Sequence, residues 1–213
     1  MRAKVFLVTV FLLVSVSLSA QESKKKEEFG VYMKTTLAHN YKFKLNSTLT
    51  DLGCKKIPDI FMYGMLGFYF GIKKAEITVD FGAGGLYSKT TRVFSSISNL
   101  SAGYKLTLPK KHSLIFAGNI AYEGYNVITR IEKGNLDFQN AVLTNSTAFH
   151  LELEQLMLGP KITWRNDGIY DISIGYDFGV MPMRWKSNTV NILNSPKERI
   201  DRIHIDFIIR FAL

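Results

Sequence analysis

Two histidines in the 213-residue chain are followed, two residues later, by a carboxylate. This arrangement could support acid–base chemistry. His150 precedes Glu152 and Glu154, and His204 precedes Asp206. A carboxylate can orient a histidine as a general base, but acyl transfer or hydrolysis also requires a nucleophile within hydrogen-bonding distance. No serine or cysteine near either histidine stands in a recognisable nucleophile motif. The spacing therefore indicates no catalytic residue, and we predict that the chain is not an enzyme.

Metal, cofactor and nucleic-acid chemistry are not indicated either. No grouping of His, Cys, Asp and Glu has the spacing of a metal site, and the glycines form no phosphate loop. Cys54 is the only cysteine, which excludes a scaffold held by disulfides. The formal charge of +9 comes without a basic–aromatic motif. We predict no metal, no cofactor and no nucleic-acid partner, and expect attraction to anionic lipid headgroups.

A second set of charged side chains recurs at alternate positions within apolar segments. A period of two places side chains on one face of a β-strand, so these charges would share one face of a sheet. The set comprises Lys34, Glu76, Asp80, Lys105, Glu123, Lys161, Asp171, Asp177, Asp206 and Arg210. In a narrow closed sheet such charges must pair, because an unpaired buried charge is costly.

Neighbouring strands suggest partners for these charges. The expected contacts are Glu76 or Asp80 with Lys105, Lys161 with Asp171, and Asp206 with Lys34. A proton or ion path is an alternative function for the same residues. If the strands close into a narrow barrel, its interior is only wide enough for side chains, which favours a plug of salt bridges.

Alternating strands must position these charges, and the last eleven residues are the clearest of them. In residues 203–213 the odd positions are large and apolar, and the even positions are mostly polar or small. This pattern over about 9–11 residues is typical of a transmembrane β-strand. Seven earlier segments show the same alternation, at residues 29–37, 60–72, 75–87, 99–108, 113–123, 156–164 and 169–180.

The connections between these eight segments alternate in length. Three are tight, at 73–74, 109–112 and 165–168, and four are longer, at 38–59, 88–98, 124–155 and 181–202. Short periplasmic turns and long external loops are typical of outer-membrane barrels, and this order leaves both termini on the periplasmic side. The sequence therefore predicts an all-β fold, an eight-stranded antiparallel up-and-down transmembrane β-barrel.

One region breaks the alternation. The apolar residues Leu151 and Leu153 stand at odd positions, whereas Leu156 stands at an even position. A β-bulge near 154–155, a loop upstream of it, or a short helix would each explain the break. Pro160 cannot donate a ladder hydrogen bond, which predicts further irregularity in the same strand.

Alternation alone does not decide which face of the barrel is apolar. A lipocalin-like barrel would place the apolar face inside and carry a hydrophobic ligand. Here the mixed face is rich in Gly, Ala and Ser, which suits a narrow filled interior, and aromatic residues near the strand ends could form two interfacial girdles. These residues are Phe29, Trp164, Tyr170 and Phe211 at the periplasmic ends and Tyr63, Tyr87, Tyr122 and Trp185 at the external ends. We favour the membrane barrel over a secreted carrier.

The N-terminal residues indicate export. Residues 1–20 combine basic residues, an apolar run at 5–16 and Ala20 at the expected cleavage site, as a secretory signal peptide does. Residues 21–28 are predicted to form a charged periplasmic tail, and residues 29–213 the barrel. The predicted location is the outer membrane of a Gram-negative cell, after cleavage of the signal peptide.

Eight alternating strands, the segment Ser19-Ala20-Gln21 and the terminal Phe211-Ala212-Leu213 resemble the small outer-membrane barrels of the OmpA/OmpX kind, and the PorT-like barrel domains of Bacteroidota. The last residue departs from that pattern, since such barrels usually end in an aromatic residue. The resemblance implies insertion by the barrel-assembly machinery. It also raises a lipid A-modifying acyltransferase or deacylase as an alternative function, because some eight-stranded barrels are such enzymes.

The predicted long loops carry many cations. They are Lys42, Lys44, Lys55, Lys56, Arg130, Lys133, Arg184, Lys186, Lys197, Arg199 and Arg202. A solvated rim is the simplest interpretation, and binding of lipopolysaccharide phosphates is a functional one. We predict an outer-membrane β-barrel with a filled interior and a structural or surface-interaction role through its external loops. Its expected partners are outer-membrane lipid, lipopolysaccharide and an unidentified protein.

Overall fold

The computed structural model describes residues 27–51, 54–87, 91–109, 112–130, 148–166, 168–187 and 195–212. The predicted signal peptide at 1–20 and tail residues 21–26 lie outside these ranges. No helix in the described part of the chain is long and apolar enough to cross a membrane.

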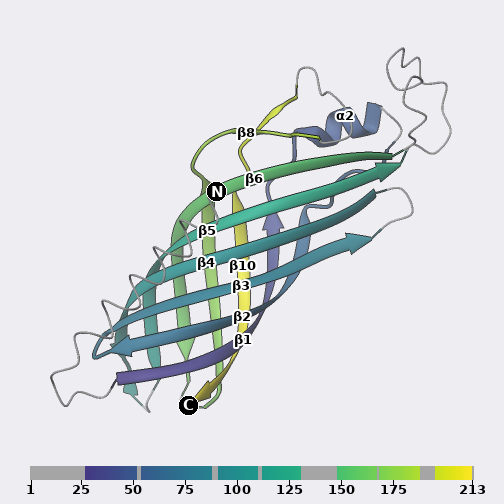
Figure 1. The fold of residues 1–213 in the computed structure, drawn as a ribbon. Helices are drawn as coiled ribbons and strands as arrows, with labels where there is room; N and C mark the ends of the chain where they lie inside the picture. The colour runs from purple at the N-terminus through teal and green to yellow at the C-terminus, as the bar shows by residue number, and fades with distance from the viewer. Residues whose placement is uncertain are drawn as a thin grey trace.

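Eight strands close into one barrel, which confirms the predicted fold (Figure 1). Each strand is antiparallel to its neighbours, and pairing of the first strand with the last closes the sheet, from Gly30 opposite Ala212 to Asn40 opposite Arg202. The strands are β1 (Glu27–Asn40), β2 (Ile60–Ile72), β3 (Ala75–Tyr87), β4 (Thr91–Thr107), β5 (Ser113–Arg130), β6 (Ala148–Arg165), β7 (Tyr170–Gly179) and β10 (Arg202–Ala212). We call the end with the Lys73–Lys74 turn the turn end, and the opposite end the cap end.

The outside of the barrel is covered by large apolar side chains. Met33 and Leu37 on β1, Phe68 on β2 and Ile174 on β7 are between 45% and 52% exposed, whereas Lys34 between two of them is 4% exposed. Leaving a large apolar side chain in water rather than burying it costs about 1.5–3 kcal/mol. This surface therefore needs apolar surroundings. Its polarity is the reverse of a lipocalin's, so the carrier alternative does not fit the structure.

The strands extend further toward the cap end than the sequence predicted. β4 begins at Thr91 rather than residue 99, β5 continues to Arg130, and β6 begins at Ala148. Because β3 and β4 pair as far as Tyr87 opposite Arg92, the predicted long connection at 88–98 was wrong over most of its length.

The parity break near residues 154–155 has a different cause from those predicted. β5 and β6 pair in one unbroken register from Ser113 opposite Arg165 to Arg130 opposite Ala148, so there is neither a bulge nor a helix. Leu151 and Leu153 face inward like the polar residues further along β6. The alternation is constant, and it is the lumen that becomes apolar toward the cap end.

The predicted irregularity at Pro160 is confirmed. The pairing of β6 with β7 is recorded at Leu158 opposite Phe178 and resumes at Lys161 opposite Gly175, with no pair between them. At the adjacent Gly159 the two backbones come so close that an added Cβ would lie 1.7 Å from the carbonyl oxygen of Tyr176. Only glycine fits there.

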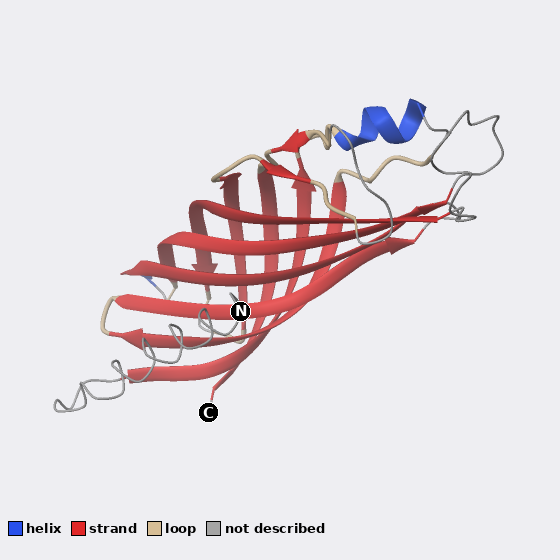
Figure 2. Ribbon diagram, turned by 45° about the horizontal axis from the view of Figure 1, so that its top comes forward, coloured by secondary structure: helices blue, strands red, loops and turns tan. Residues whose placement is uncertain are grey.

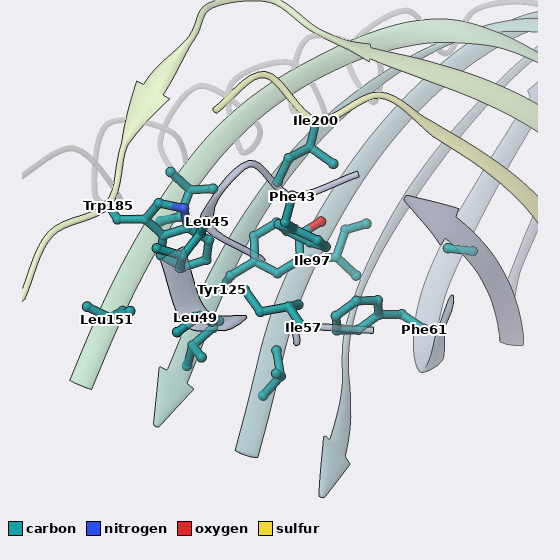
Figure 3. Packing of buried hydrophobic residues seen from close by; sticks show 14 of the residues in the cluster. Phe43, Leu45, Leu49, Ile57, Phe61, Ile97, Tyr125, Leu151, Trp185 and Ile200 are labelled. Atoms are coloured by element: carbon teal, nitrogen blue, oxygen red, sulfur yellow. The ribbon is translucent and has the colours of Figure 1, made fainter. Parts of the chain in front are cut away.

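Two loop segments fold over the cap end (Figure 2). One contains helix α2 (Leu45–Asp51), and the other contains the short paired strands β8 (Met183–Arg184) and β9 (Lys197–Glu198). They lie above the mouth of the barrel and contribute side chains to an apolar cluster inside it (Figure 3).

Candidate functional site

The lumen is crossed by layers of paired charges, and the first lies at the turn end. Arg165 donates two hydrogen bonds to Glu76, at 2.5 and 2.9 Å, and a third from Nε to Asp171 at 3.0 Å. Arg210 Nε lies 2.9 Å from the same Asp171 oxygen. These residues come from β6, β3, β7 and β10, so the layer ties together strands on different sides of the barrel.

The middle of the lumen holds a second layer centred on Asp80. Lys34 Nζ donates to its Oδ1 at 2.8 Å, Asn99 Nδ2 donates to the same oxygen at 2.7 Å, and the Tyr32 hydroxyl donates to Oδ2 at 2.7 Å. Asp80 is 1% exposed. Its charge is thus fully satisfied by side chains from β1 and β4.

Asp206 forms the second centre of this middle layer. Thr36 and Ser173 donate to its two oxygens at 2.8 and 2.7 Å, and His204 Nδ1 lies 3.1 Å away. The other ring nitrogen of His204 lies 3.4 Å from Asp177. The serine bonds the carboxylate rather than the histidine, so the arrangement lacks the nucleophile–base contact of a hydrolase.

A third layer lies toward the cap end and is built around Arg202. Its guanidinium bonds Glu123 at 3.1 Å and also bonds Asp177. Tyr63 and Ser95 donate to Glu123, which leaves both of its oxygens occupied. Arg202 is 1% exposed, so its assignment to a solvated loop was wrong.

Lys161 is the exception among the buried cations. It is 6% exposed, and no hydrogen bond or close ion pair of its ammonium occurs within the described residues. It lines a cavity of about 20 Å³ that also borders Lys34, Thr78 and Arg165. A cavity of this size holds about one water molecule.

The structure corrects all three predicted pairings. Lys105 bonds Glu28 at the turn end at 3.0 Å instead of Glu76 or Asp80. Asp171 accepts a hydrogen bond from Arg165 and forms an ion pair with Arg210, instead of pairing with Lys161. Lys34 bonds Asp80 rather than Asp206. The inward placement of the charges was right, but two missed arginines, Arg165 and Arg202, take most of the anions.

Beyond the third layer the lumen becomes apolar. Phe43, Phe61 and Tyr125 pack with ring centroids 5.5 to 6.3 Å apart, and Trp185 packs against Phe43 at 6.4 Å (Figure 3). Leu49 of helix α2 is 2% exposed in the same cluster. The two loop segments and the inner faces of the strands thus form a common hydrophobic core, which we call the cap.

One buried carboxylate holds the two loop segments of the cap together. Glu198 accepts hydrogen bonds from the backbone N–H groups of Lys44 and Leu45, at 3.0 and 2.7 Å, and from Trp185 Nε1 at 3.2 Å. The segment around α2 and the segment around β8 and β9 are therefore fixed to each other. Nothing in the sequence distinguished Glu198 from a solvated loop residue.

The aromatic girdles differ in part from the prediction. The four turn-end residues Phe29, Trp164, Tyr170 and Phe211 are all exposed on the outer face, as expected, and so is Tyr87 at the cap end. Tyr122 is also exposed, but it lies in the middle of β5 rather than at its end. Tyr63 and Trp185 are buried, so their assignment to a girdle was wrong. Tyr41 and Tyr176, 49% and 37% exposed, stand on the outer face instead.

The remaining histidines also lack a catalytic arrangement. His150 lies 3.9 Å from Glu152 at the surface, His112 stacks on Trp164, and His39 contacts the edge of Tyr41. Within the described ranges, no three or more His, Cys, Asp or Glu side chains are grouped so that they could hold a metal ion.

Comparisons with known proteins give likeness in fold at low sequence identity. No protein-family model matches the chain, and no curated protein sequence matches it. Neisserial surface protein A superposes with a TM-score of 0.50 and 12% identity, over 88% of this chain and all of that one. A major outer membrane protein from Thermus thermophilus gives 0.48 and 10%, over 84% and 99% of the two chains. Ail from Yersinia pestis gives 0.46 and 9%, over 88% and 99%. The first match shows that this chain has the closed eight-stranded barrel fold of small outer-membrane proteins.

Proposed function

We propose that the protein is an outer-membrane β-barrel with a sealed lumen that presents a folded cap at the cell surface. The reversed polarity of the barrel is the observation that carries this proposal. Apolar side chains cover its outer wall, while charged side chains fill its interior. Such a wall is stable in the hydrocarbon of a bilayer, because a closed sheet leaves no open edge of unpaired backbone groups.

The lumen supports a non-conducting role. Three layers of charges cross it, and the cap closes one end with a hydrophobic core. An ion would have to break buried pairs such as Arg202 with Glu123, and separating a buried pair costs several kcal/mol. The role is therefore structural or one of surface interaction, with the cap as the contact surface.

Nothing in the described residues favours the lipid A-modifying alternative. His204 is 4% exposed inside the lumen and lies between two carboxylates. It is thus remote from any lipid along the outer wall. We propose that the protein is not an enzyme.

The proposal includes export and assembly. Cleavage after Ala20 and a mature chain of residues 21–213 follow from the signal-like N-terminal sequence, and insertion by the barrel-assembly machinery follows from the barrel resemblance. The finer likeness to PorT-like barrels of Bacteroidota rests on Ser19-Ala20-Gln21 alone and stays a prediction.

Electrophoresis of the outer-membrane fraction, with and without boiling in SDS, tests the location and the closed barrel. We expect a band that shifts on heating, and no stepwise conductance after reconstitution into planar bilayers. Lipid A from cells that express the wild-type chain or His204→Ala should give identical mass spectra. A soluble protein without a heat shift would contradict the membrane assignment, and a change in lipid A that depends on His204 would replace the proposal by the enzymatic alternative.

A further inference from the structure

A row of aromatic rings lies on the outer wall at the cap end, where β1, β7 and β10 meet. His39 and Tyr41 contact edge to face with centroids 5.6 Å apart, and Tyr41 contacts Tyr176 at 6.2 Å. Tyr41 and Tyr176 are both well exposed. Amphipathic rings in this position are typical of the headgroup level of a membrane, where the ring contacts lipid and the polar tip contacts water.

Asp201 fixes these rings in place. Its carbonyl oxygen accepts the backbone N–H of Tyr41 at 2.8 Å, and its carboxylate accepts the backbone N–H of Gly179 at 3.0 Å and the Tyr176 hydroxyl at 3.4 Å. The start of β10 is thus tied to the ends of β1 and β7. A ligand would find this surface already ordered, which lowers the entropic cost of binding.

Arg199 places a weakly held cation beside the rings. Its side chain is 55% exposed, and its Nε lies 3.7 Å from Asp201 Oδ1, too far for a hydrogen bond. Lys42 follows Tyr41 directly and is exposed, without an ion pair to any residue that the structure describes. The guanidinium forms no hydrogen bond to a residue in the described ranges, so it can turn to a stronger anion without breaking one there.

The surroundings of this cluster are apolar on the side toward the middle of the barrel. Ile174 on β7 and Ile205 on β10 lie opposite each other, nearer the turn end than Tyr176, and are 50% and 41% exposed. On the same wall, Ile203 lies opposite Tyr176 in the sheet. An anion bound here would sit at the border between an apolar wall and water. A phosphate attached to acyl chains has that geometry, whereas a soluble polyanion would gain nothing from the apolar side.

We propose that Arg199, Lys42, Tyr41 and Tyr176 form a binding site for a phosphate group of the surrounding glycolipid. This inference rests on the proposed outer-membrane location. The guanidinium bonds phosphate oxygens with its planar fork, and the tyrosine hydroxyls lie at the same level. The carboxylate of Asp201 repels an anion, and the positive charges of Arg199 and Lys42 must outweigh that repulsion. The site makes this side of the barrel prefer phosphorylated lipid.

Native mass spectrometry of the detergent-purified protein tests the site. The probes are bis-phosphorylated lipid A and the same lipid after enzymatic removal of both phosphates. We expect the phosphorylated lipid to bind at least about tenfold more tightly, and Arg199→Gln with Lys42→Gln to abolish that preference, since a charge-assisted hydrogen bond contributes about a factor of ten. The matched control is Lys55→Gln with Lys56→Gln, which removes the same charge from the loop before β2 and should keep the preference.

Three outcomes would overturn the inference. Equal binding of both lipids would show that phosphate is not recognised, and equal loss in the control variant would show that only total charge matters. Full competition by soluble dextran sulfate would indicate a soluble polyanion rather than lipid. Every binding measurement uses protein that has first shown the heat shift on gels. A negative binding result therefore contradicts the phosphate site and not the membrane assignment.

Discussion

The lumen and the cap are both buried inside one barrel wall, yet they are stabilised by opposite chemistry. In the lumen, Arg165 and Arg202 each bond two carboxylates from other strands. In the cap, Phe43, Leu49 and Trp185 pack in a core, and Glu198 is the one buried carboxylate among the cap residues that the structure describes. The alternation of the strands is the same in both regions, so it is the composition of the inner face that differs.

The difference follows from where each region gets its residues. The charged layers of the lumen come from strands, and a strand inside a narrow barrel must fill the interior with whatever its inner face carries. Much of the core of the cap comes from loop segments. Their apolar residues pack wherever the inner faces of the strands are apolar as well. Ionic layers hold the barrel strands at fixed distances, whereas the cap closes the mouth without adding a strand to the barrel sheet.

Arg202→Ala should give the largest effect. The substitution leaves Glu123 and Asp177 buried without their cation, and breaking a buried pair in this way costs about 3–5 kcal/mol. We expect the midpoint of urea unfolding in lipid vesicles, followed by the heat shift on gels, to fall accordingly. Arg199→Ala removes an exposed arginine three residues earlier and should change stability by less than about 0.5 kcal/mol. Equal effects would show that the third layer contributes no more than a surface charge.

Leu49→Ala tests whether the cap is a separate unit. Removing this buried side chain should cost about 2–5 kcal/mol of local stability through lost contacts and a cavity. Hydrogen exchange of the α2 amides should accelerate, while the urea midpoint of the barrel stays unchanged. Thr48→Ala on the exposed side of α2 is the control. If the barrel unfolds at lower urea as well, cap and lumen form one cooperative unit and the contrast between them disappears.

Glu198→Gln should loosen the contact between the two loop segments by about 1 kcal/mol, because it keeps the shape but weakens three hydrogen bonds. Trp185 reports the change, since its indole N–H bonds Glu198. With Trp164→Phe as background only this tryptophan remains, and its emission should shift to the red. Glu154→Gln, at an exposed carboxylate, should leave the spectrum unchanged. An unshifted spectrum in Glu198→Gln would mean that packing alone holds the cap.

Much of the barrel could be predicted because the alternation of apolar and polar residues depends only on the local conformation of each strand. The number of strands and the shared face of Lys34, Asp80 and Asp206 follow from a period of two. Closure and the inward direction of that face were predicted from the alternating connection lengths and from the Gly, Ala and Ser residues on the mixed face. The pairings could not be predicted, because they depend on which strand ends meet across the lumen. Arg202 shares parity with His204 and Asp206, so extending the last strand by one residue would have placed it inside.

The cap could not be predicted from the sequence, for a different reason. Its only local sign is Leu45 and Leu49, four residues apart, which is the spacing of one helical face. A seven-residue helix is too short to be stable alone and forms here because the barrel mouth buries that face. Trp185 was read as a girdle residue for the same reason: in a loop, sequence does not tell whether an aromatic ring faces lipid or folds over the lumen.

Lys161→Met should have the smallest effect and makes the sharpest distinction within the lumen. Lys161 is buried but bonds no described carboxylate directly, so replacing it by an apolar side chain of similar length removes a costly charge without orphaning a partner. We expect the free energy of unfolding to change by no more than about 1 kcal/mol. Lys34→Met, the same substitution in the middle layer, deprives Asp80 of its cation and should cost about 3–5 kcal/mol. Urea unfolding of the two variants side by side measures the difference. Similar losses in both would mean that Lys161 stabilises the acidic groups of the middle layer from a distance, and that the layers act through their summed charge rather than through individual pairs.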